Sequence, residues 1–206
     1  MRQLYCSPNS PYARKARILL KEKGLEFEEL MIDAANPPEA MVRGNPNRKI
    51  PTLVDGPLVL FESNVVEEYL LRTYPGASGP VPRLADAMVR PDHPWEDALI
   101  LSTIETALDS GAILFQAQRA GLAADKLPWL QRELARAKSG LDWLEAHATP
   151  EGFIPGRFSI QDLNTVCLLA WADLRQPFPW RGRKKLEALL QRYQDRPSIK
   201  ATHPPG

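Results

Sequence analysis

The hydrophobic residues in the first third of the chain alternate between the spacing of strands and the spacing of helices. Four short apolar runs have the length and composition of strands, and they are Arg2–Cys6, Phe27–Ile32, Thr52–Val54 and Leu58–Phe61. The last two runs are joined by Asp55-Gly56, a dipeptide typical of a tight hairpin turn. The pattern therefore predicts two separate strands followed by a hairpin.

Two segments among these strands have helical spacing. The first carries Tyr12, Ala16 and Leu19, and Gly24 stands where a helix would take its C-cap. The second begins at Ser63, directly after the hairpin. The predicted order is strand, helix, strand, then hairpin, then helix, which is the pattern of a small α/β domain.

Composition changes abruptly between Pro75 and Pro94, where proline and glycine are frequent. Such a stretch does not sustain a regular element and is typical of a linker between domains. After it, every apolar stripe has helical spacing. We therefore predict an α/β domain over residues 1–76, a linker over 77–92 and an all-helical bundle over 93–206.

One helix of the second half has a recognisable start. Ser159 and Asp162 have the spacing of a capping box, with Asp in place of the usual Glu or Gln, directly before an apolar helical stripe. We expect both residues to be structural. Cys167 lies on that stripe and Cys6 in the first strand, so both thiols are expected to be buried.

Composition and charge narrow the class of protein. The 206 residues are 44% hydrophobic and 25% charged, with a net charge of +1, so neither a nucleic-acid partner nor a membrane surface is indicated. No apolar run approaches the ~18 residues of a membrane span, and the N-terminus lacks a signal peptide. Two distant cysteines and three scattered histidines indicate no disulfide framework and no metal site. We expect a cytoplasmic protein without a metal or a nucleotide.

The segment with the clearest chemistry is Ser10-Pro11-Tyr12-Ala13, between the first strand and the first helix. It resembles the Cys-Pro-Tyr-Cys segment of glutaredoxins, with serine and alanine in place of both cysteines. Thiol–disulfide exchange needs a protein thiolate, so we expect that reaction to be lost while the strand-turn-helix arrangement is kept. Ser10 followed by proline is also a good helix N-cap, and the two roles are compatible. The nearby basic side chains are expected on the solvated face of the first helix, and they are Arg14, Lys15, Arg17, Lys21 and Lys23.

Two further segments indicate a ligand with a peptide-like middle and an amino-acid end. In the thioredoxin-like fold a cis proline precedes the third strand, and Ile50-Pro51 stands at that place. The N–H and C=O of the residue before it can pair with an extended peptide. Glu62-Ser63 begins a helix, where N–H groups and a hydroxyl suit a carboxylate and Glu62 suits an ammonium group.

Together these segments resemble the cytosolic glutathione transferase family, in its serine-type branch of plant tau and bacterial members. The resemblance implies a thioredoxin-like domain, a helical domain and a homodimer. It implies that Ser10 activates the thiol of glutathione, the co-substrate, and that Ile50 and Pro51 present backbone to it. By the same analogy Glu62 and Ser63 hold the γ-glutamyl end, and Lys49 the glycyl carboxylate.

The resemblance implies conjugation of glutathione to a small apolar electrophile. We expect the electrophile site between the two halves, with Tyr12 and Phe115 as candidates. Two alternatives remain open. One is another glutathione-dependent reaction, such as that of a peroxidase, an isomerase or a dehalogenase. The other is a non-catalytic regulator of the stringent starvation protein type, which often lacks the glutathione-site residues kept here.

Overall fold

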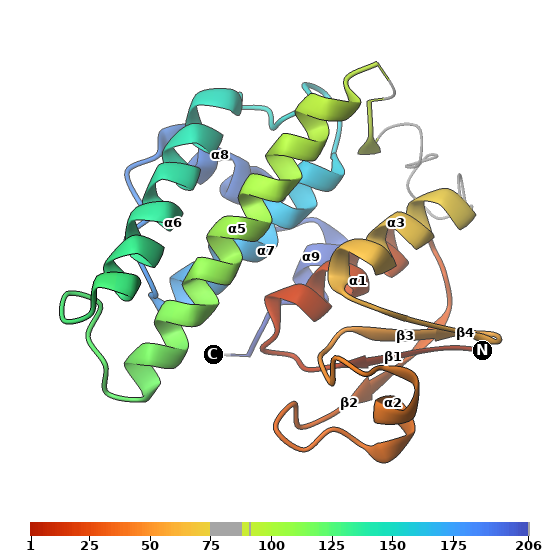
Figure 1. Cartoon of the computed structure of the whole chain (residues 1–206). Helices are drawn as coiled ribbons and strands as arrows, with labels where there is room; N and C mark the ends of the chain where they lie inside the picture. Colours follow the sequence, from red (N-terminus) through yellow and green to blue (C-terminus); the bar gives the residue numbers. More distant parts are fainter. Residues whose placement is uncertain (75–87, 91, 206) are drawn as a thin grey trace. The chain divides into compact units, whose positions relative to one another are not determined.

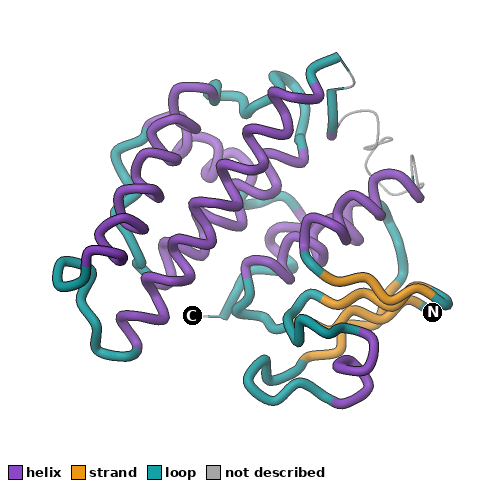
Figure 2. The backbone as a smooth tube through the Cα atoms, viewed as in Figure 1, coloured by secondary structure: helices purple, strands orange, loops and turns teal. Residues whose placement is uncertain are grey.

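The computed structural model describes residues 1–74, 88–90 and 92–205, and it divides into two compact units (Figure 1). One unit comprises Met1–Ala87 together with Arg196–Gly206, and the other comprises Met88–Asp195. The predicted linker over 77–92 lies mostly outside the described residues. The predicted succession of an α/β domain and an all-helical domain is confirmed, as the separate strands and helices in Figure 2 show.

The first unit is built on a four-stranded mixed sheet. Its elements are β1 (Arg2–Cys6), α1 (Pro11–Glu22), β2 (Phe27–Met31), α2 (Glu39–Gly44), β3 (Thr52–Asp55), β4 (Leu58–Phe61), α3 (Ser63–Thr73) and α9 (Pro197–Lys200). The strand order is β2-β1-β3-β4, with β1 and β2 parallel and the other pairs antiparallel. All four predicted strands and the hairpin are confirmed. The sequence pattern missed α2, because six residues are too few to show a helical period.

The core of this unit lies between the sheet and the pair α1 and α3. It is formed by apolar side chains with almost no exposed surface, which include Leu4, Ala16, Leu19, Leu20, Leu53, Val66 and Leu70. Ala16 and Leu19 of the predicted apolar stripe are buried and Tyr12 is half-buried, but burial is not confined to one face, since ten of the twelve residues of α1 are buried. Helix α1 is therefore held against the sheet by hydrophobic contacts, and its N-terminus is fixed at the end of β1.

The prediction that the basic residues of α1 form a solvated face is wrong. Arg14, Lys15, Arg17 and Lys23 are all buried. The physical reason is that three of these side chains find oxygen partners in the same unit. Arg17 pairs with Glu29 on β2, Lys23 donates to the carbonyl oxygen of residue 74, and Arg14 donates to that of residue 199. Such buried cations require partners, and the sequence pattern does not reveal partners distant in the chain.

Residues 196–205 belong to the first unit, although we predicted them as part of the helical domain. Helix α9 packs against α1. The Arg196 guanidinium donates two hydrogen bonds to the Glu22 carboxylate, at 2.6 and 2.7 Å, and the Ser198 hydroxyl donates a third. Because Glu22 is the last residue of α1, these bonds fix the C-terminal end of the helix.

The second unit is helical. It contains α5 (Pro94–Arg119), α6 (Pro128–His147), α7 (Ile160–Arg175) and α8 (Lys184–Tyr193). Helix α5 packs against α6 and α7, and α8 packs against α7 and α6. The predicted burial of Cys167 on α7 is confirmed. By length and apolar composition alone, α5 is also a candidate membrane span, which the sequence analysis did not find. Core helices of water-soluble proteins share these properties, so this feature is weak evidence for a membrane.

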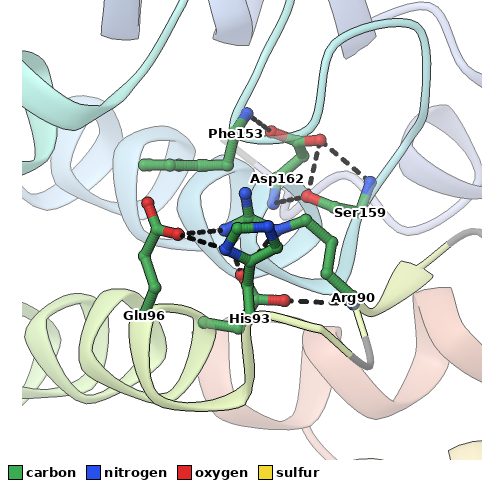
Figure 3. Close-up of polar contacts among 7 residues, drawn as sticks. Arg90, His93, Glu96, Phe153, Ser159 and Asp162 are labelled. Atoms are coloured by element: carbon green, nitrogen blue, oxygen red, sulfur yellow. Dashed lines mark hydrogen bonds and ion pairs between the residues drawn. The ribbon is translucent and has the colours of Figure 1, made fainter.

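Polar contacts fix the starts of α5 and α7 (Figure 3). The predicted capping box is confirmed, because Ser159 Oγ accepts from the Asp162 N–H while Asp162 accepts from the Ser159 N–H at 2.9 Å. Asp162 also accepts from the Phe153 N–H, at 3.0 Å. Before α5, the Arg90 N–H and guanidinium donate to Asp97, at 3.1 and 2.9 Å. At α7 the capping box satisfies an N–H that the helix start would otherwise leave unpaired, whereas at α5 the bonds join the preceding segment to the Asp97 side chain in the first turn.

Candidate functional site

The register of the sheet brings three loops to one edge of the first unit. Thr52, at the start of β3, lies opposite Tyr5 near the end of β1 and opposite Phe61 at the end of β4. Since β3 is antiparallel to both neighbours, the loop after β1, the loop before β3 and the turn after β4 emerge together. These are the three segments that the sequence analysis selected.

Ser10 lies in the first of these loops and caps α1. Its Oγ accepts a hydrogen bond from the Ala13 N–H at 3.2 Å, and Pro11 is the first helical residue. The N-cap role predicted for Ser10 is therefore confirmed. An N-cap uses a lone pair of the hydroxyl oxygen, and the O–H remains a donor for a ligand. The half-buried Ser10 side chain thus combines a structural role with the capacity to donate to an anion.

The second loop carries the predicted cis peptide bond. Ile50-Pro51 is cis, and Pro51 is buried at the start of β3. Ile50 is half-buried, and the Lys49 side chain is exposed. The backbone of Ile50 therefore lies at the surface of the sheet edge, with an exposed cationic side chain beside it.

Two asparagines organise this loop, and the sequence analysis missed both. Asn45 is completely buried, and its Nδ2 donates to the Lys49 carbonyl oxygen at 2.8 Å and to Thr52 Oγ1 at 2.7 Å. Its Oδ1 accepts from the Asn47 N–H at 2.9 Å. An Asn side-chain oxygen that accepts from the N–H two residues on forms an Asx-turn. The Asn45-Pro46-Asn47 sequence is typical of such a turn and was the available signal.

The third segment joins the second through a side-chain contact. Glu62 Oε1 accepts from Asn47 Nδ2 at 2.5 Å. Glu62 has a φ of 65°, a conformation that costs a non-glycine residue about 1–2 kcal/mol. Ser63 is the first residue of α3, as predicted, and is nearly fully buried. The N–H groups of the first turn of α3 therefore open onto the same edge as the Glu62 carboxylate.

Cys6 is close to Ser10 in the sequence but has no chemical role that the structure supports. It is fully buried, as predicted, and its Sγ lies 3.7 Å from Met31 Sδ. Burial raises the pKa of the Cys6 thiol to about 11, against a smaller lowering effect from Arg17. The thiol therefore stays protonated at neutral pH and is a poor nucleophile.

The two candidates for the electrophile site belong to different units. Tyr12 lies in the first turn of α1, with Lys15 Nζ 5.5 Å from its ring centroid. Phe115 lies near the end of α5 and is half-buried. Its ring meets that of Trp171 edge-on, with the centroids 5.9 Å apart.

No metal centre accompanies these groups in the part of the chain that the structure describes. There, His, Cys, Asp and Glu side chains form no group of three or more that could hold a metal ion. The candidate site therefore consists of a hydroxyl, a backbone segment at a cis proline, a carboxylate and a helix N-terminus. Such a set of groups is suited to an extended ligand with charged ends.

Comparison with known proteins finds a family match for each of the two units. The chain matches a family model of the glutathione S-transferase N-terminal domain over residues 4–78 and a model of the C-terminal domain over residues 128–192. The structure resembles that of a glutathione S-transferase from Methylobacterium radiotolerans in complex with glutathione sulfonate. That match has a TM-score of 0.82 and 26% identity, and it covers 100% of this chain and 95% of the other.

Two curated relatives differ in the extent of their match. Glutathione S-transferase 3 of Zea mays is 27% identical over 97% of this chain and 92% of the relative. A stringent starvation protein A homologue of Coxiella burnetii is 44% identical, but over only 35% of this chain and 34% of the relative. The similarity to the starvation protein is thus confined to about a third of each chain. The two domain models and the match along the whole structure agree, and the chain belongs to the glutathione S-transferase family.

Proposed function

We propose that the protein binds glutathione and promotes attack of its thiolate on a small apolar electrophile. The observation that carries this proposal is the meeting of Ser10, Ile50-Pro51 and Glu62-Ser63 at one sheet edge, which follows from the pairing of β3 with both neighbours. The similar structure from Methylobacterium radiotolerans contains glutathione sulfonate. Family membership and the retained site groups support the same ligand here.

Each group has a proposed role along the glutathione molecule. The backbone of Ile50 pairs with the cysteinyl residue, in the manner of an added strand. Glu62 accepts from the ammonium group of the γ-glutamyl end, and the Ser63 hydroxyl and the N-terminus of α3 receive its carboxylate. The exposed Lys49 pairs with the glycyl carboxylate. Asn45 and Asn47 act as positioning residues, since they hold the backbone of this loop and the Glu62 side chain.

Ser10 is proposed to stabilise the thiolate as a hydrogen-bond donor. A free thiol has a pKa of ~8.5, and lowering it by two units requires about 2.7 kcal/mol. A hydrogen bond to an anion contributes ~1.5–3 kcal/mol and a helix N-terminus ~0.3–1 kcal/mol. Because Ser10 is the N-cap of α1, both effects act from the same place. No general base is needed to reach a reactive thiolate at neutral pH.

We also propose a subtype, a cellular location and an assembly state for the protein. We assign the protein to the serine-type branch because serine stands at position 10, and we place it in the cytoplasm because Cys6 and Cys167 are free thiols. Tyr12 and Phe115 are proposed to contact the electrophile. We propose a homodimer, supported by the exposed Trp95 and Leu99 on successive turns of α5. A role in detoxification fits an enzyme of this type.

A regulatory function like that of the stringent starvation proteins is the second candidate. The 44% identity to the Coxiella burnetii homologue favours it, although over a third of the chain only. Against it, the chain retains Ser10, the cis Ile50-Pro51 bond and the Glu62-Ser63 pair. A regulator that does not bind glutathione has no need of these groups. A glutathione peroxidase, isomerase or dehalogenase would use the same binding groups, and substrate tests distinguish these reactions.

Calorimetric titration with glutathione, together with conjugation of a chromogenic aryl halide, tests the proposal. We expect saturable binding by the wild type, and a 10- to 100-fold lower kcat in Ser10→Ala with glutathione affinity changed by only a few-fold. Ser10→Gly is the matched control for the cap, since glycine at an N-cap costs only a few tenths of a kcal/mol. It is expected to lose turnover as Ser10→Ala does. Failure of the wild type to bind millimolar glutathione would leave a regulator built on this fold.

A further inference from the structure

The end of α5 in the helical unit carries an aromatic cluster. Phe115 meets Trp171 of α7 edge-on, and Phe178 lies against Gly111 one turn earlier on α5. A Cβ at Gly111 would lie 2.7 Å from Phe178 Cε1 and 3.0 Å from Trp171 Cζ3, so glycine is needed for this close approach. The cluster is therefore tightly packed beneath the half-buried ring of Phe115.

Two guanidinium groups approach that ring from the ends of different helices. The Cζ atom of Arg119, the last residue of α5, lies 6.0 Å from the Phe115 ring centroid. The Cζ atom of Arg175, the last residue of α7, lies 5.6 Å from the same centroid. Two positive charges are thus gathered around one aromatic ring. The negative ends of the two helix dipoles favour positive charge at these positions.

Among the residues that the structure describes, no acidic side chain pairs with either guanidinium. Within residues 1–74, 88–90 and 92–205, Arg119 and Arg175 have no hydrogen bond or ion pair. From residue 110 to its end, α5 contains no acidic residue. The nearest acid along α7, Asp173, accepts instead from Trp180 Nε1 at 2.8 Å and from Arg181 Nε at 3.1 Å. The pair therefore presents uncompensated positive charge beside an apolar ring.

Arg181 is an arginine of the same unit that differs from Arg119 and Arg175 because it has an acidic partner. Its Cζ lies 4.2 Å from the Trp180 ring centroid, so it also covers an aromatic ring. It pairs with the carboxylate of Asp173 at the same time. Its charge is thus satisfied within the unit, unlike those of Arg119 and Arg175. Guanidinium groups match the planar geometry of a carboxylate, which makes an acidic ligand the natural partner of an unsatisfied pair.

We propose that Arg119 and Arg175 bind an acidic group of the electrophile, so that the second substrate is an aromatic or apolar molecule bearing a carboxylate. This inference rests on the proposed transferase function, in which Phe115 contacts the electrophile. The apolar part of the substrate lies on the Phe115 ring and its carboxylate accepts from the guanidinium groups. For an aryl chloride, the glutathione sulfur forms a bond to the ring carbon and chloride leaves with the electron pair of the broken C–Cl bond.

Binding of two unreactive analogues separates charge from shape. 3,5-Dinitrobenzoate and 3,5-dinitrobenzamide have the same ring and nearly the same size, and only the first is an anion at neutral pH. Calorimetry is expected to show at least tenfold tighter binding of the benzoate by the wild type. The double variant Arg119→Gln/Arg175→Gln is expected to lose this preference, while Arg181→Gln keeps it. Equal affinities in the wild type, or an unchanged preference in the double variant, would overturn the proposal.

A lysine pair and a kinetic assay complete the test. Arg119→Lys/Arg175→Lys keeps both charges at the helix ends and loses the planar fork, so an intermediate preference is expected. A melting temperature close to that of the wild type in every variant shows that the fold is intact.

The kinetic assay uses 4-chloro-3,5-dinitrobenzoate and the corresponding benzamide as substrates. In the double glutamine variant, KM for the benzoate is expected to rise about tenfold and KM for the benzamide to change by less than twofold. Absence of turnover with both compounds, while the benzoate preference persists, would reject the transferase reaction and retain the anion site.

Discussion

Arg196 and Glu22 are 174 residues apart in the sequence and form a doubly hydrogen-bonded ion pair, with distances of 2.6 and 2.7 Å. The Glu22 side chain is 2% exposed and lies at the last position of α1. The N-terminus of the same helix carries Ser10. The pair therefore anchors one end of the helix whose other end is proposed to hold the thiolate.

Removing one member of this pair is expected to destabilise the protein. Glu22→Ala leaves the Arg196 guanidinium without its carboxylate in a largely buried place, which typically costs about 3 kcal/mol or more. Urea unfolding followed by circular dichroism measures this loss. Arg72→Ala is the matched control, since its ion pair with Glu68 is well exposed and is expected to contribute less than about 1 kcal/mol. Similar losses in the two variants would contradict the role given to the buried pair.

Asp162 is expected to make stability depend on pH between about 4 and 6. Burial raises the pKa of the Asp162 carboxyl to about 6, although hydrogen bonds from Ser159 and Phe153 act in the opposite direction. An ordinary Asp has a pKa of ~3.9, so the folded state binds more protons in this window than the unfolded state. The free energy of unfolding therefore falls as pH rises through the window, by up to about 3 kcal/mol.

Comparison of the wild type with Asp162→Asn isolates this contribution. Asparagine does not titrate, so the variant is expected to have a flatter dependence of unfolding free energy on pH between 4 and 6. The variant also loses an acceptor of the capping box, which lowers its stability by about 1 kcal/mol below pH 4, where Asp162 of the folded wild type is protonated. The change in slope is the diagnostic quantity. Parallel curves for the two proteins would show that Asp162 has an ordinary pKa in the folded state.

Asn45 is expected to control glutathione affinity without contacting glutathione. Asn45→Ala removes the donor to the Lys49 carbonyl oxygen and the acceptor of the Asn47 N–H, so the loop before Pro51 loses its internal bonds. We expect KM for glutathione to rise about tenfold, with a smaller change in kcat, because the loss of such bonds costs ~1–3 kcal/mol. Asn36→Ala is the control, since Asn36 bonds only within an exposed turn. An unchanged KM in Asn45→Ala would show that the loop keeps its shape without Asn45.

The proposed homodimer makes a prediction about α5. The Trp95 side chain is 82% exposed and Leu99 is 60% exposed. An aspartate in place of Trp95 would bring a charge into an apolar interface, so Trp95→Asp is expected to sediment as a monomer where the wild type is a dimer. Trp129→Asp on α6 changes a half-exposed tryptophan elsewhere in the same unit, and it is expected to remain dimeric. A wild-type monomer, or a dimeric Trp95→Asp, would reject this surface.

The elements with strong local signals were predictable from the sequence. The Asp55-Gly56 turn fixed the hairpin, and Ser159 with Asp162 marked the start of α7, because turns and caps depend on residues close together in the chain. The three site loops were found for the same reason. Each lies directly at the end of a strand or the start of a helix, where a short sequence motif is sufficient to predict the local structure.

Features that depend on distant partners were not predictable. Arg14 and Arg17 belong to a run of basic residues, which is typical of a solvated helix face. Only the fold shows that the carbonyl oxygen of residue 199 and the Glu29 carboxylate receive their hydrogen bonds. Asn45 was overlooked because its bonds span the loop rather than a regular element. The approach of Arg119 and Arg175 to the Phe115 ring likewise depends on two helix ends that are far apart in the sequence.

The contact of α9 with α1 has a consequence for the order of events during synthesis. The helical unit is inserted between the two parts of the sequence that make up the first unit. Glu22 leaves the ribosome long before Arg196, so α1 is made without the cation that its buried carboxylate requires. The helical unit begins later in the sequence than the sheet, but its last residue is synthesised before Arg196, which the first unit needs. The sheet-bearing unit therefore completes its native structure last, after the domain that follows it in the sequence.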